Sequence, residues 1–232
     1  MTKQKGNSDR IREHFEREAP DYDALIPLLV PYYRENIDTM VSAVLKEPDS
    51  DIKVLDLGCG TGNVSLRVKK GFPGAEITCV DVSGKMLEEA MKKLSGFSGI
   101  EYQESDVRDF DLSGRYDAVL AQLALHHISS AEEKRSFFRK VFDALRPGGQ
   151  FIISDVVLGS TGRLHELYMR KWIEFMKKSI PGDQVEKWVE KYHREDSPFR
   201  LMDELSWLRE AGFGVVDVVC KYFGAAVYLG VK

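Results

Sequence analysis

Two hydrophobic patterns alternate along the middle of the chain. Short apolar runs rich in Val, Ile and Leu recur between longer segments whose apolar residues are spaced three and four apart. The runs predict strands at residues 53–56, 76–81, 100–103, 116–121 and 150–157. The spaced segments predict helices at residues 63–70, 83–94 and 131–145. Because strands that alternate with helices are joined by crossover connections, this pattern predicts a parallel sheet with helices on both faces.

The two ends of the chain carry different patterns. Before the first strand, helices are predicted at residues 10–18 and 34–45, whereas Pro27 and Pro31 make residues 25–33 more loop than helix. After the fifth strand, residues 159–200 are helical, charged and aromatic, and an amphipathic helix follows at 201–211. Two strands, 214–220 and 225–231, are separated by Phe223-Gly224, so we expect them to form an antiparallel hairpin.

These elements predict one α/β architecture. It is a doubly wound, Rossmann-like, mostly parallel seven-stranded sheet that ends in an antiparallel hairpin. We expect an N-terminal helical lid (1–50), a cofactor-binding core (51–158), a helical insert that caps the acceptor (159–205), and a last helix with the terminal strand pair (206–232).

A glycine-rich turn follows the first predicted strand. The sequence from Asp56 to Gly62 reads Asp-Leu-Gly-Cys-Gly-Thr-Gly, and a helical pattern begins directly after it. Glycines permit positive φ angles and let a ligand approach the bare main chain, while a helix start offers unpaired N–H groups. A dinucleotide fingerprint would need glycine at position 63, where this chain has Asn63. The turn therefore predicts a cofactor site, but not one of the nicotinamide type.

Three acidic residues follow the ends of consecutive predicted strands. They are Asp56, Asp81 and Asp106, and the carboxyl ends of parallel strands meet at one edge of the sheet. Carboxylates suit a cationic ligand better than a pyrophosphate, and they accept charge-assisted hydrogen bonds from hydroxyl groups. This pattern favours a positively charged cofactor, although the acids could also only cap turns.

Charge and composition exclude several classes of protein. The net charge of −4 provides no global basic field for nucleic acid. Three dispersed cysteines, Cys59, Cys79 and Cys220, fit neither a disulfide framework nor a zinc site, which favours a reducing compartment. The N-terminus lacks the apolar segment of a signal peptide, and no apolar run approaches the roughly 20 residues of a membrane span. We expect a cytoplasmic protein with no metal and no membrane partner.

Four sequence features, in one order, carry a family resemblance. They are the turn from Asp56 to Gly62, Asp81 at the end of strand two, Asp106-Val107 after strand three, and Leu145-Arg146-Pro147-Gly148-Gly149 before strand five. In these features the chain resembles the class I S-adenosylmethionine-dependent methyltransferases. The resemblance implies S-adenosyl-L-methionine as the cofactor. It implies the following cofactor-binding residues: Asp56, Gly58, Gly60, Gly62, Asp81, Val82, Met86, Asp106, Val107, Gln122, Tyr22 and Tyr33.

The implied reaction moves a methyl group from the sulfonium to an acceptor. We expect a small-molecule acceptor, with tRNA as the second choice. The chain contains no Asn/Asp-Pro-Pro-Tyr sequence and no Pro-Pro pair, which argues against methylation of an exocyclic DNA amine. His126 and His127 follow strand four and are the candidate catalytic residues, since histidine can act as a base near neutral pH. The alternative is that they only close the turn.

A second, narrower resemblance involves the N-terminal segment and the insert. Val30-Pro31-Tyr32-Tyr33 and Leu164-His165-Glu166-Leu167 are similar to the carboxy-S-adenosylmethionine synthases of tRNA wobble-uridine modification. Those enzymes use a tyrosine, matched by Tyr33, and an arginine that binds the extra carboxylate of the modified cofactor. An ungapped match places Val189 at that arginine, and Arg194 or Arg200 reaches it only with a local shift. The synthase activity is therefore the alternative function.

Further alternatives stay open. The chain could be a cofactor-binding module without catalysis, or a nicotinamide oxidoreductase. Tyr22, Tyr32 and Tyr33 could contact the sulfonium through cation–π interactions, could close the pocket or could be packing residues. The aromatic residues of the insert could line a pocket, form core, or build the seam of a homodimer; they are Trp172, Phe175, Trp188 and Tyr192.

Overall fold

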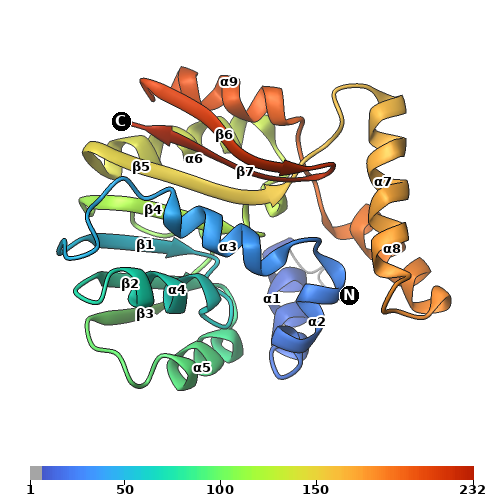
Figure 1. Cartoon of the computed structure of the whole chain (residues 1–232), viewed down its shortest axis with the longest axis horizontal. Helices are drawn as coiled ribbons and strands as arrows, with labels where there is room; N and C mark the ends of the chain where they lie inside the picture. The colour runs from blue at the N-terminus through green and yellow to red at the C-terminus, as the bar shows by residue number, and fades with distance from the viewer. Residues whose placement is uncertain (1–6) are drawn as a thin grey trace, which may run out of the picture.

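The computed structural model describes residues 7–232, so the first six residues of the expected lid lie outside the described part of the chain. Its centre is a seven-stranded sheet in the order β3-β2-β1-β4-β5-β7-β6 (Figure 1). The strands are β1 (Lys53–Leu57), β2 (Glu76–Asp81), β3 (Ile100–Glu104), β4 (Tyr116–Gln122), β5 (Leu145–Val156), β6 (Val215–Tyr222) and β7 (Ala225–Val231). Only β7 runs antiparallel to its neighbours, which confirms the predicted mostly parallel sheet with a terminal hairpin.

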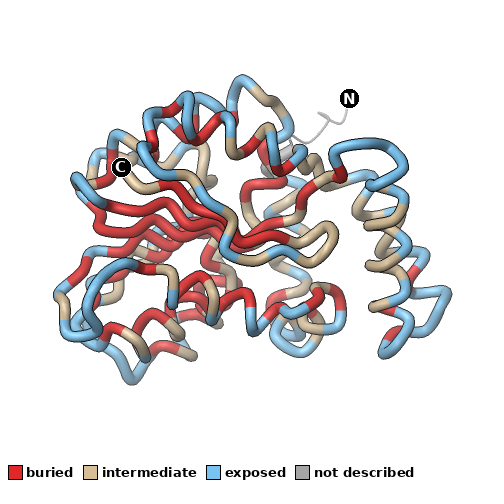
Figure 2. The backbone as a smooth tube through the Cα atoms, turned by 45° about the horizontal axis from the view of Figure 1, so that its top comes forward, coloured by how far each residue is buried: buried red, intermediate tan, exposed pale blue. Residues whose placement is uncertain are grey.

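The central strands are buried on both faces. Every residue of β4 is buried, and its neighbouring side chains join two different cores. Val119 and Ala121 pack on one side of the sheet, whereas Ala118 and Leu120 pack on the other. The middle of a strand in this position must be apolar on both faces, which explains the continuous apolar run from Ala118 to Ala121. Figure 2 shows the strands as a buried band through the molecule.

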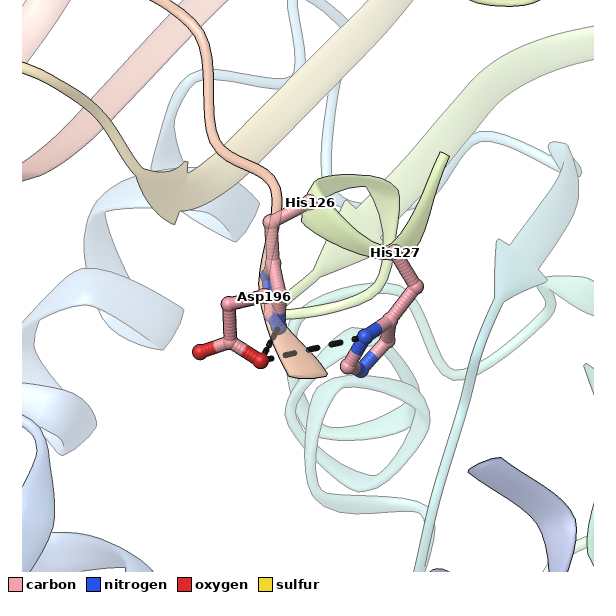
Figure 3. Close-up of side chains that lie close together, drawn as sticks. All are labelled: His126, His127 and Asp196. Atoms are coloured by element: carbon pink, nitrogen blue, oxygen red, sulfur yellow. Dashed lines mark ion pairs between the residues drawn. The ribbon is translucent and has the colours of Figure 1, made fainter. Parts of the chain in front are cut away.

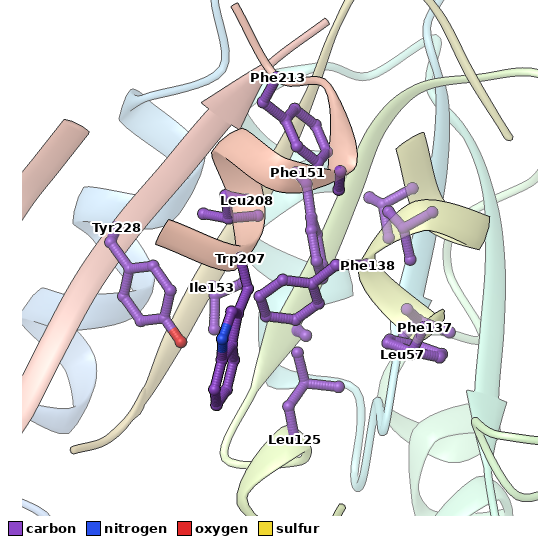
Figure 4. Packing of buried hydrophobic residues seen from close by; sticks show 14 of the residues in the cluster. Leu57, Leu125, Phe137, Phe138, Phe151, Ile153, Trp207, Leu208, Phe213 and Tyr228 are labelled. Carbon is purple, nitrogen blue, oxygen red and sulfur yellow. The ribbon is translucent and has the colours of Figure 1, made fainter. Parts of the chain in front are cut away.

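Helices cover both faces of the sheet. The helices are α1 (Asn7–Glu18), α2 (Tyr22–Leu29), α3 (Tyr33–Ser42), α4 (Asn63–Gly71), α5 (Gly84–Lys93), α6 (Ala131–Ala144), α7 (Gly162–Met176), α8 (Gly182–Glu195) and α9 (Leu201–Ala211). α6 and α9 pack on one face, where Phe138 meets Phe151 edge to face at 5.5 Å and Trp207 lies close by (Figure 4). α3, α4 and α5 contribute to the apolar cluster on the opposite face.

The segment expected to be mostly loop contains a helix, so that prediction is wrong. α2 spans Tyr22–Leu29 with Pro27 inside it. Ile26 and Leu29 are buried against other elements, and this packing outweighs the helix-breaking tendency of proline in a helix of eight residues.

The expected lid is shorter than residues 1–50. α3 packs against the sheet face beside α4 through Ile37, Met40 and Val41, so it belongs to the core layer. The two other N-terminal helices, α1 and α2, lie beyond the carboxyl edge of the strands (Figure 1).

The insert forms α7 and α8 at one end of the molecule (Figure 1). It joins α2 through a small cluster that contains Leu29, Met176 and Val185, and Trp172 Nε1 donates a hydrogen bond of 2.7 Å to the Leu29 carbonyl. The expected boundary at residue 205 falls inside α9, since α9 begins at Leu201 and packs on α6. No helix among the described residues has the length and apolar character to cross a membrane.

Candidate functional site

Two adjoining pockets lie at the carboxyl edge of the sheet, near the point where the strand order reverses between β1 and β4. We call them the narrow pocket, of about 620 Å³, and the wide pocket, of about 1160 Å³, both including the space at their mouths. The narrow pocket is lined by Ile11, Phe15, Tyr22, Gly58, Gly60, Asp81, Val82, Met86, Asp106, Val107, Arg108, Gln122, Leu123, Ala124, His127 and Ile128.

Four residues belong to the walls of both pockets: Phe15, Tyr22, Leu123 and His127. Phe15 and Tyr22 come from α1 and α2, and the other two come from the segment that follows β4. Ligands in the two pockets would therefore meet at this shared wall.

The glycine turn shapes the floor of the narrow pocket. Gly58 has a φ of 67°, and a Cβ there would lie 2.5 Å from the Cβ of Ala124. Only glycine therefore permits the segment after β4 to approach the segment after β1 so closely. The next glycine is fixed by a carboxylate, since Gly60 N–H donates to Asp81 Oδ2 at 2.8 Å.

Asp81 is buried, and both of its carboxyl oxygens accept hydrogen bonds from backbone N–H groups. Its second oxygen accepts a hydrogen bond of 2.9 Å from Ser83 N–H. Burial raises the pKa of Asp81 to about 6, although the backbone hydrogen bonds from Ser83, Gly60 and Val82 act in the opposite direction. Asp81 can still accept ribose hydroxyls, because each carboxylate oxygen has a second lone pair.

Asp56 lies behind the turn rather than on the pocket wall. Its Oδ2 accepts a hydrogen bond of 2.6 Å from Ser65 Oγ on α4, while Oδ1 is buried and has no hydrogen-bond partner. Burial raises the pKa of Asp56 to about 7, against the effect of the Ser65 hydrogen bond. Gly62 and Tyr33 are also outside the lining of the narrow pocket. The structure therefore does not bring these three predicted cofactor residues to the pocket surface.

In the lining of the narrow pocket, Asp106 is paired with Arg108. Asp106 accepts hydrogen bonds from Arg108 Nε at 2.8 Å and from its terminal nitrogen at 2.6 Å. Gln122 ends β4, and its buried Nε2 has no hydrogen-bond partner. The sequence analysis named Gln122 and Asp106 but not Arg108, which also lines the narrow pocket.

The Asn63 side chain links the N-terminal helices to the glycine turn through hydrogen bonds. Its Nδ2 donates to Asp23 Oδ1 at 2.9 Å and to the Tyr33 hydroxyl at 3.1 Å, and its Oδ1 accepts from Lys93 Nζ at 2.6 Å. Asp23 also pairs with Lys93 at 2.7 Å and accepts from Thr61 Oγ1. Asn63 stands where a dinucleotide-binding fingerprint has glycine. Its side chain therefore fills this region, which leaves no open space for a phosphate there.

The wide pocket is built from the insert, the N-terminal helices and the end of the hairpin. Three aromatic residues of the insert line it: Trp172, Trp188 and Tyr192. A pocket wall was one of the alternatives open for them. Phe175 instead packs in the small cluster beside α2. Lys191 Nζ lies 3.1 Å from Glu18 Oε1 and also contacts His14, so α8 is tied to α1 across the pocket. In the described part of the chain, no arginine lines this pocket.

The two histidines lie where the pockets meet, and they have different surroundings. His126 Nδ1 lies 2.5 Å from Asp155 Oδ1, and the other oxygen of Asp155 accepts the backbone N–H groups of Leu125 and His126. Asp196, just after α8, lies 3.7 Å from His126 Nε2 and 3.9 Å from His127 Nδ1 (Figure 3). Both ring nitrogens of His127 are buried and have no hydrogen-bond partner of normal geometry, although the backbone of Glu195 lies close enough to act on the pKa of the ring.

The surroundings of the two histidines shift their pKa values in opposite directions. Burial acts to lower the pKa of His126, but the carboxylates of Asp155 and Asp196 outweigh it and raise the pKa. Burial, together with the neighbouring His126, lowers the pKa of His127 well below its ordinary range. His127 is therefore a neutral imidazole at pH 7, with a free lone pair at the shared wall.

Sequence reasoning missed both carboxylates of this cluster. Asp155 had a usable signal, because it is an acid near the end of an otherwise apolar buried strand. Asp196 had none, since it lies in a polar stretch far from the histidines along the chain.

Residues 54–149 match a family described as "Methyltransferase domain", and this range carries the glycine turn and most of the narrow pocket. This part of the chain is a methyltransferase domain of the class I S-adenosylmethionine-dependent type. The chain is therefore an S-adenosylmethionine-dependent methyltransferase, and S-adenosyl-L-methionine is its cofactor.

Similar proteins extend the likeness over the whole chain. A carboxy-S-adenosyl-L-methionine synthase of Nautilia profundicola is 22% identical over 222 residues, which cover 95% of this chain and 94% of that protein. Among solved structures, the DhpI–SAM–HEP complex covers both chains fully, with 20% identity and a TM-score of 0.68. The methyltransferase SibL has a TM-score of 0.62 and 21% identity over 87% of this chain, which spans only 55% of SibL.

The narrow pocket of the methyltransferase fits this cofactor. Asp81 offers a buried carboxylate for hydroxyl donors, and Gln122 offers a buried amide nitrogen without a partner. A Cβ on Gly60 would meet no atom within 4 Å, so the main chain there is open to a ligand.

Proposed function

We propose that this enzyme transfers a methyl group from S-adenosyl-L-methionine to a small molecule held in the wide pocket. The observation that carries the proposal is the shared wall: Phe15, Tyr22, Leu123 and His127 border both pockets. A transfer reaction needs its two reactants aligned at one point with water excluded, and two pockets that meet at a mostly apolar wall supply that arrangement.

The cofactor would be held by the residues of the narrow pocket. Asp81 would accept the ribose hydroxyls, Asp106 and Val107 would border the adenine, and Gln122 would lie near the methionine portion. When bound, the cofactor supplies a methyl group that is already activated by its positively charged sulfur. Tyr22 lies in the shared wall, where its ring can contact a cation. Asp56, Gly62 and Tyr33 would act indirectly by supporting the turn and the helices over it.

His126 and His127 are the proposed catalytic residues. Burial lowers the pKa of His127, so its neutral imidazole at the shared wall can accept a proton from an acceptor hydroxyl. His126 is oriented by Asp155 and sits directly behind it, with the two ring centres 4.1 Å apart.

The alternative function is the carboxy-S-adenosylmethionine synthase reaction, and the near full-length similarity to such a synthase favours it. The geometry argues against it, because an added carboxylate needs a cationic partner. Val189 packs beside α2, Arg194 pairs with Glu195 on the surface, and Arg200 precedes α9 as an exposed residue. Two lysines line the wide pocket, and both are paired: Lys171 with Glu174, and Lys191 with Glu18.

One assay separates the two activities. The purified enzyme is incubated with S-adenosyl-L-methionine and either a metabolite extract or prephenate, and the products are identified by mass spectrometry. Methyl transfer predicts S-adenosylhomocysteine together with a methylated metabolite. Formation of a carboxylated cofactor with prephenate, without S-adenosylhomocysteine, would replace the proposal by the synthase activity.

We also propose that the enzyme works in the cytoplasm as a homodimer formed through the insert. The three free cysteines support a reducing compartment. Of the fifteen residues of α7 only Met176 is buried, although the helix carries many apolar side chains, and Leu164 is 40% exposed. Light scattering of the native chain and of Leu164→Glu would test the dimer, since a monomer in both samples contradicts it.

A further inference from the structure

His126, His127 and Asp196 converge on one small volume at the edge of the wide pocket (Figure 3). One ligand-type atom from each side chain lies within 4.8 Å of the other two, the one such convergence of three in the described part of the chain. Around a tetrahedral divalent ion, two ligand atoms that are each about 2.0–2.1 Å from the metal lie about 3.4 Å apart. The Asp196 Oδ1 distances of 3.7 and 3.9 Å therefore need only a small rotation of the side chains.

We propose that these three side chains form a binding site for a divalent transition-metal ion. Two imidazole nitrogens and one carboxylate oxygen are a ligand set that such ions accept with positions left open for another ligand. The inference extends the proposed methyltransferase function, because it assigns a chemical class to the acceptor group that enters the wide pocket.

The surroundings of His126 support metal ligation rather than a simple ion pair. Asp155 Oδ1 contacts Nδ1 of His126 and so leaves Nε2 directed at Asp196. A carboxylate on one ring nitrogen and a metal on the other is a recurrent arrangement, because the carboxylate fixes the tautomer and the ring orientation. Asp155 is itself fixed by the backbone N–H groups of Leu125 and His126 at 3.0 Å.

The third ligand is placed by the main chain. Ser197 N–H donates a hydrogen bond of 2.9 Å to the His126 carbonyl, which brings the end of α8 against the histidine segment. The Asp196 side chain is only 21% exposed, and it lies in the region where neither ring nitrogen of His127 has a hydrogen-bond partner of normal geometry. Buried polar groups are normally satisfied, so the unpaired imidazole next to a buried carboxylate indicates a missing partner between them.

The open coordination positions would face the wide pocket, whose wall includes all three ligands. An ion there would bind an oxygen of the acceptor, and a hydroxyl group is the ligand class that gains most. With an ion bound, His127 would act as a ligand instead of as the base. The ion would lower the pKa of the acceptor hydroxyl, whose proton would leave to water while the oxygen keeps the electron pair of the broken O–H bond. Because Asp155 and Asp196 together carry two negative charges, they also offset the charge of the ion.

Cobalt provides the test, because four-coordinate Co²⁺ has a visible spectrum that does not depend on activity. The full chain is stripped with a chelator and titrated with Co²⁺, and the wild type is expected to bind one ion. Asp196→Asn and His127→Gln should each weaken binding at least about tenfold, as removal of metal-site groups does elsewhere. His193→Gln on the exposed face of α8 is the matched control and should bind like the wild type.

Two outcomes would overturn the site: no Co²⁺ bound by the folded wild type, or equal binding by wild type and Asp196→Asn. His126 would then be an imidazolium paired with two carboxylates. Calorimetry with S-adenosyl-L-methionine on the metal-free chain keeps the two proposals apart. Cofactor binding without cobalt binding rejects the metal site alone, whereas cobalt binding without cofactor binding rejects the proposed function alone.

Discussion

Asp81 joins the turn to the cofactor pocket at the scale of single residues. It holds Gly60 and Ser83 by their backbone N–H groups and lines the narrow pocket with the same carboxyl group. Its position could be predicted, because an acid at the end of a strand faces the carboxyl edge whatever the tertiary detail. Its burial could not, since the raised pKa depends on α1 and α2 covering the pocket.

Cofactor affinity should therefore depend on pH near 6. The pKa of Asp81 is about 6 in the folded enzyme and 3.8 in the unfolded chain. Between these two pH values the folded enzyme binds more protons, so its stability falls as the pH rises from 3.8 to about 6. Cofactor hydroxyls need the ionised carboxylate, so affinity should rise over the same range, by at most about tenfold per pH unit. Calorimetry between pH 5 and 8 on wild type and Asp81→Asn checks this; an unchanged pH profile in the variant would contradict it.

The histidine pair should affect turnover more than cofactor binding. His127→Gln removes the neutral imidazole from the shared wall, and loss of a group that acts on a proton typically costs about 100-fold or more in kcat. His126→Gln should have a comparable effect, because Asp155 then orients no ring beside His127. Steady-state kinetics with calorimetry of the cofactor measures both quantities. Retention of wild-type kcat by both variants would remove the pair from the reaction.

At the scale of elements, the alternation of strands and helices predicted the sheet almost completely. The strands of the core contain continuous apolar runs because helices cover both faces of the sheet, and such runs are easily recognised in the sequence. The N-terminal segment was harder, since α2 depends on packing of Ile26 and Leu29 against elements elsewhere in the chain, while its own Pro27 argues against a helix. The insert was predicted as helical, but its role as a pocket wall follows only from its contact with α1 and α2.

The link between α2 and α5 should control cofactor retention. Lys93→Met removes the cation that contacts Asp23, Thr61 and Asn63, so the N-terminal helices should open more often and cofactor dissociation should accelerate several-fold. Lys92→Met is the matched control, because Lys92 pairs with Glu89 on the exposed face of the same helix. Stopped-flow displacement of the cofactor measures the rate. Equal rates in the two variants would show that this link does not hold the site closed.

At the scale of the whole molecule, one buried charge pair joins the layers. Lys134 on α6 contacts Glu204 on α9, both are 1% exposed, and Tyr228 on β7 donates a hydrogen bond of 3.1 Å to Glu204. Burial raises the pKa of Glu204, although the nearby Lys134 acts to lower it. The pair thus fixes a helix–helix contact inside a core that is otherwise apolar (Figure 4).

Breaking that pair on one side should be costly. Lys134→Met leaves the Glu204 carboxyl buried without its cation, and such changes cost about 3–5 kcal/mol of unfolding free energy. The double variant with Glu204→Leu should recover most of the loss, because two apolar side chains can replace a buried ion pair. Urea denaturation followed by circular dichroism measures each value. A double variant no more stable than Lys134→Met would contradict this account of the pair.

The fate of the methyl group tests the central claim most directly. The native enzyme is given S-adenosyl-L-methionine with a deuterated methyl group, together with a metabolite extract, and the label is followed by mass spectrometry. The geometry of two pockets that share one wall predicts that the label moves to a small metabolite while S-adenosylhomocysteine forms in equal amount. A label that stays on a sulfonium carrying an added carboxylate, with no labelled metabolite, would contradict methyl transfer.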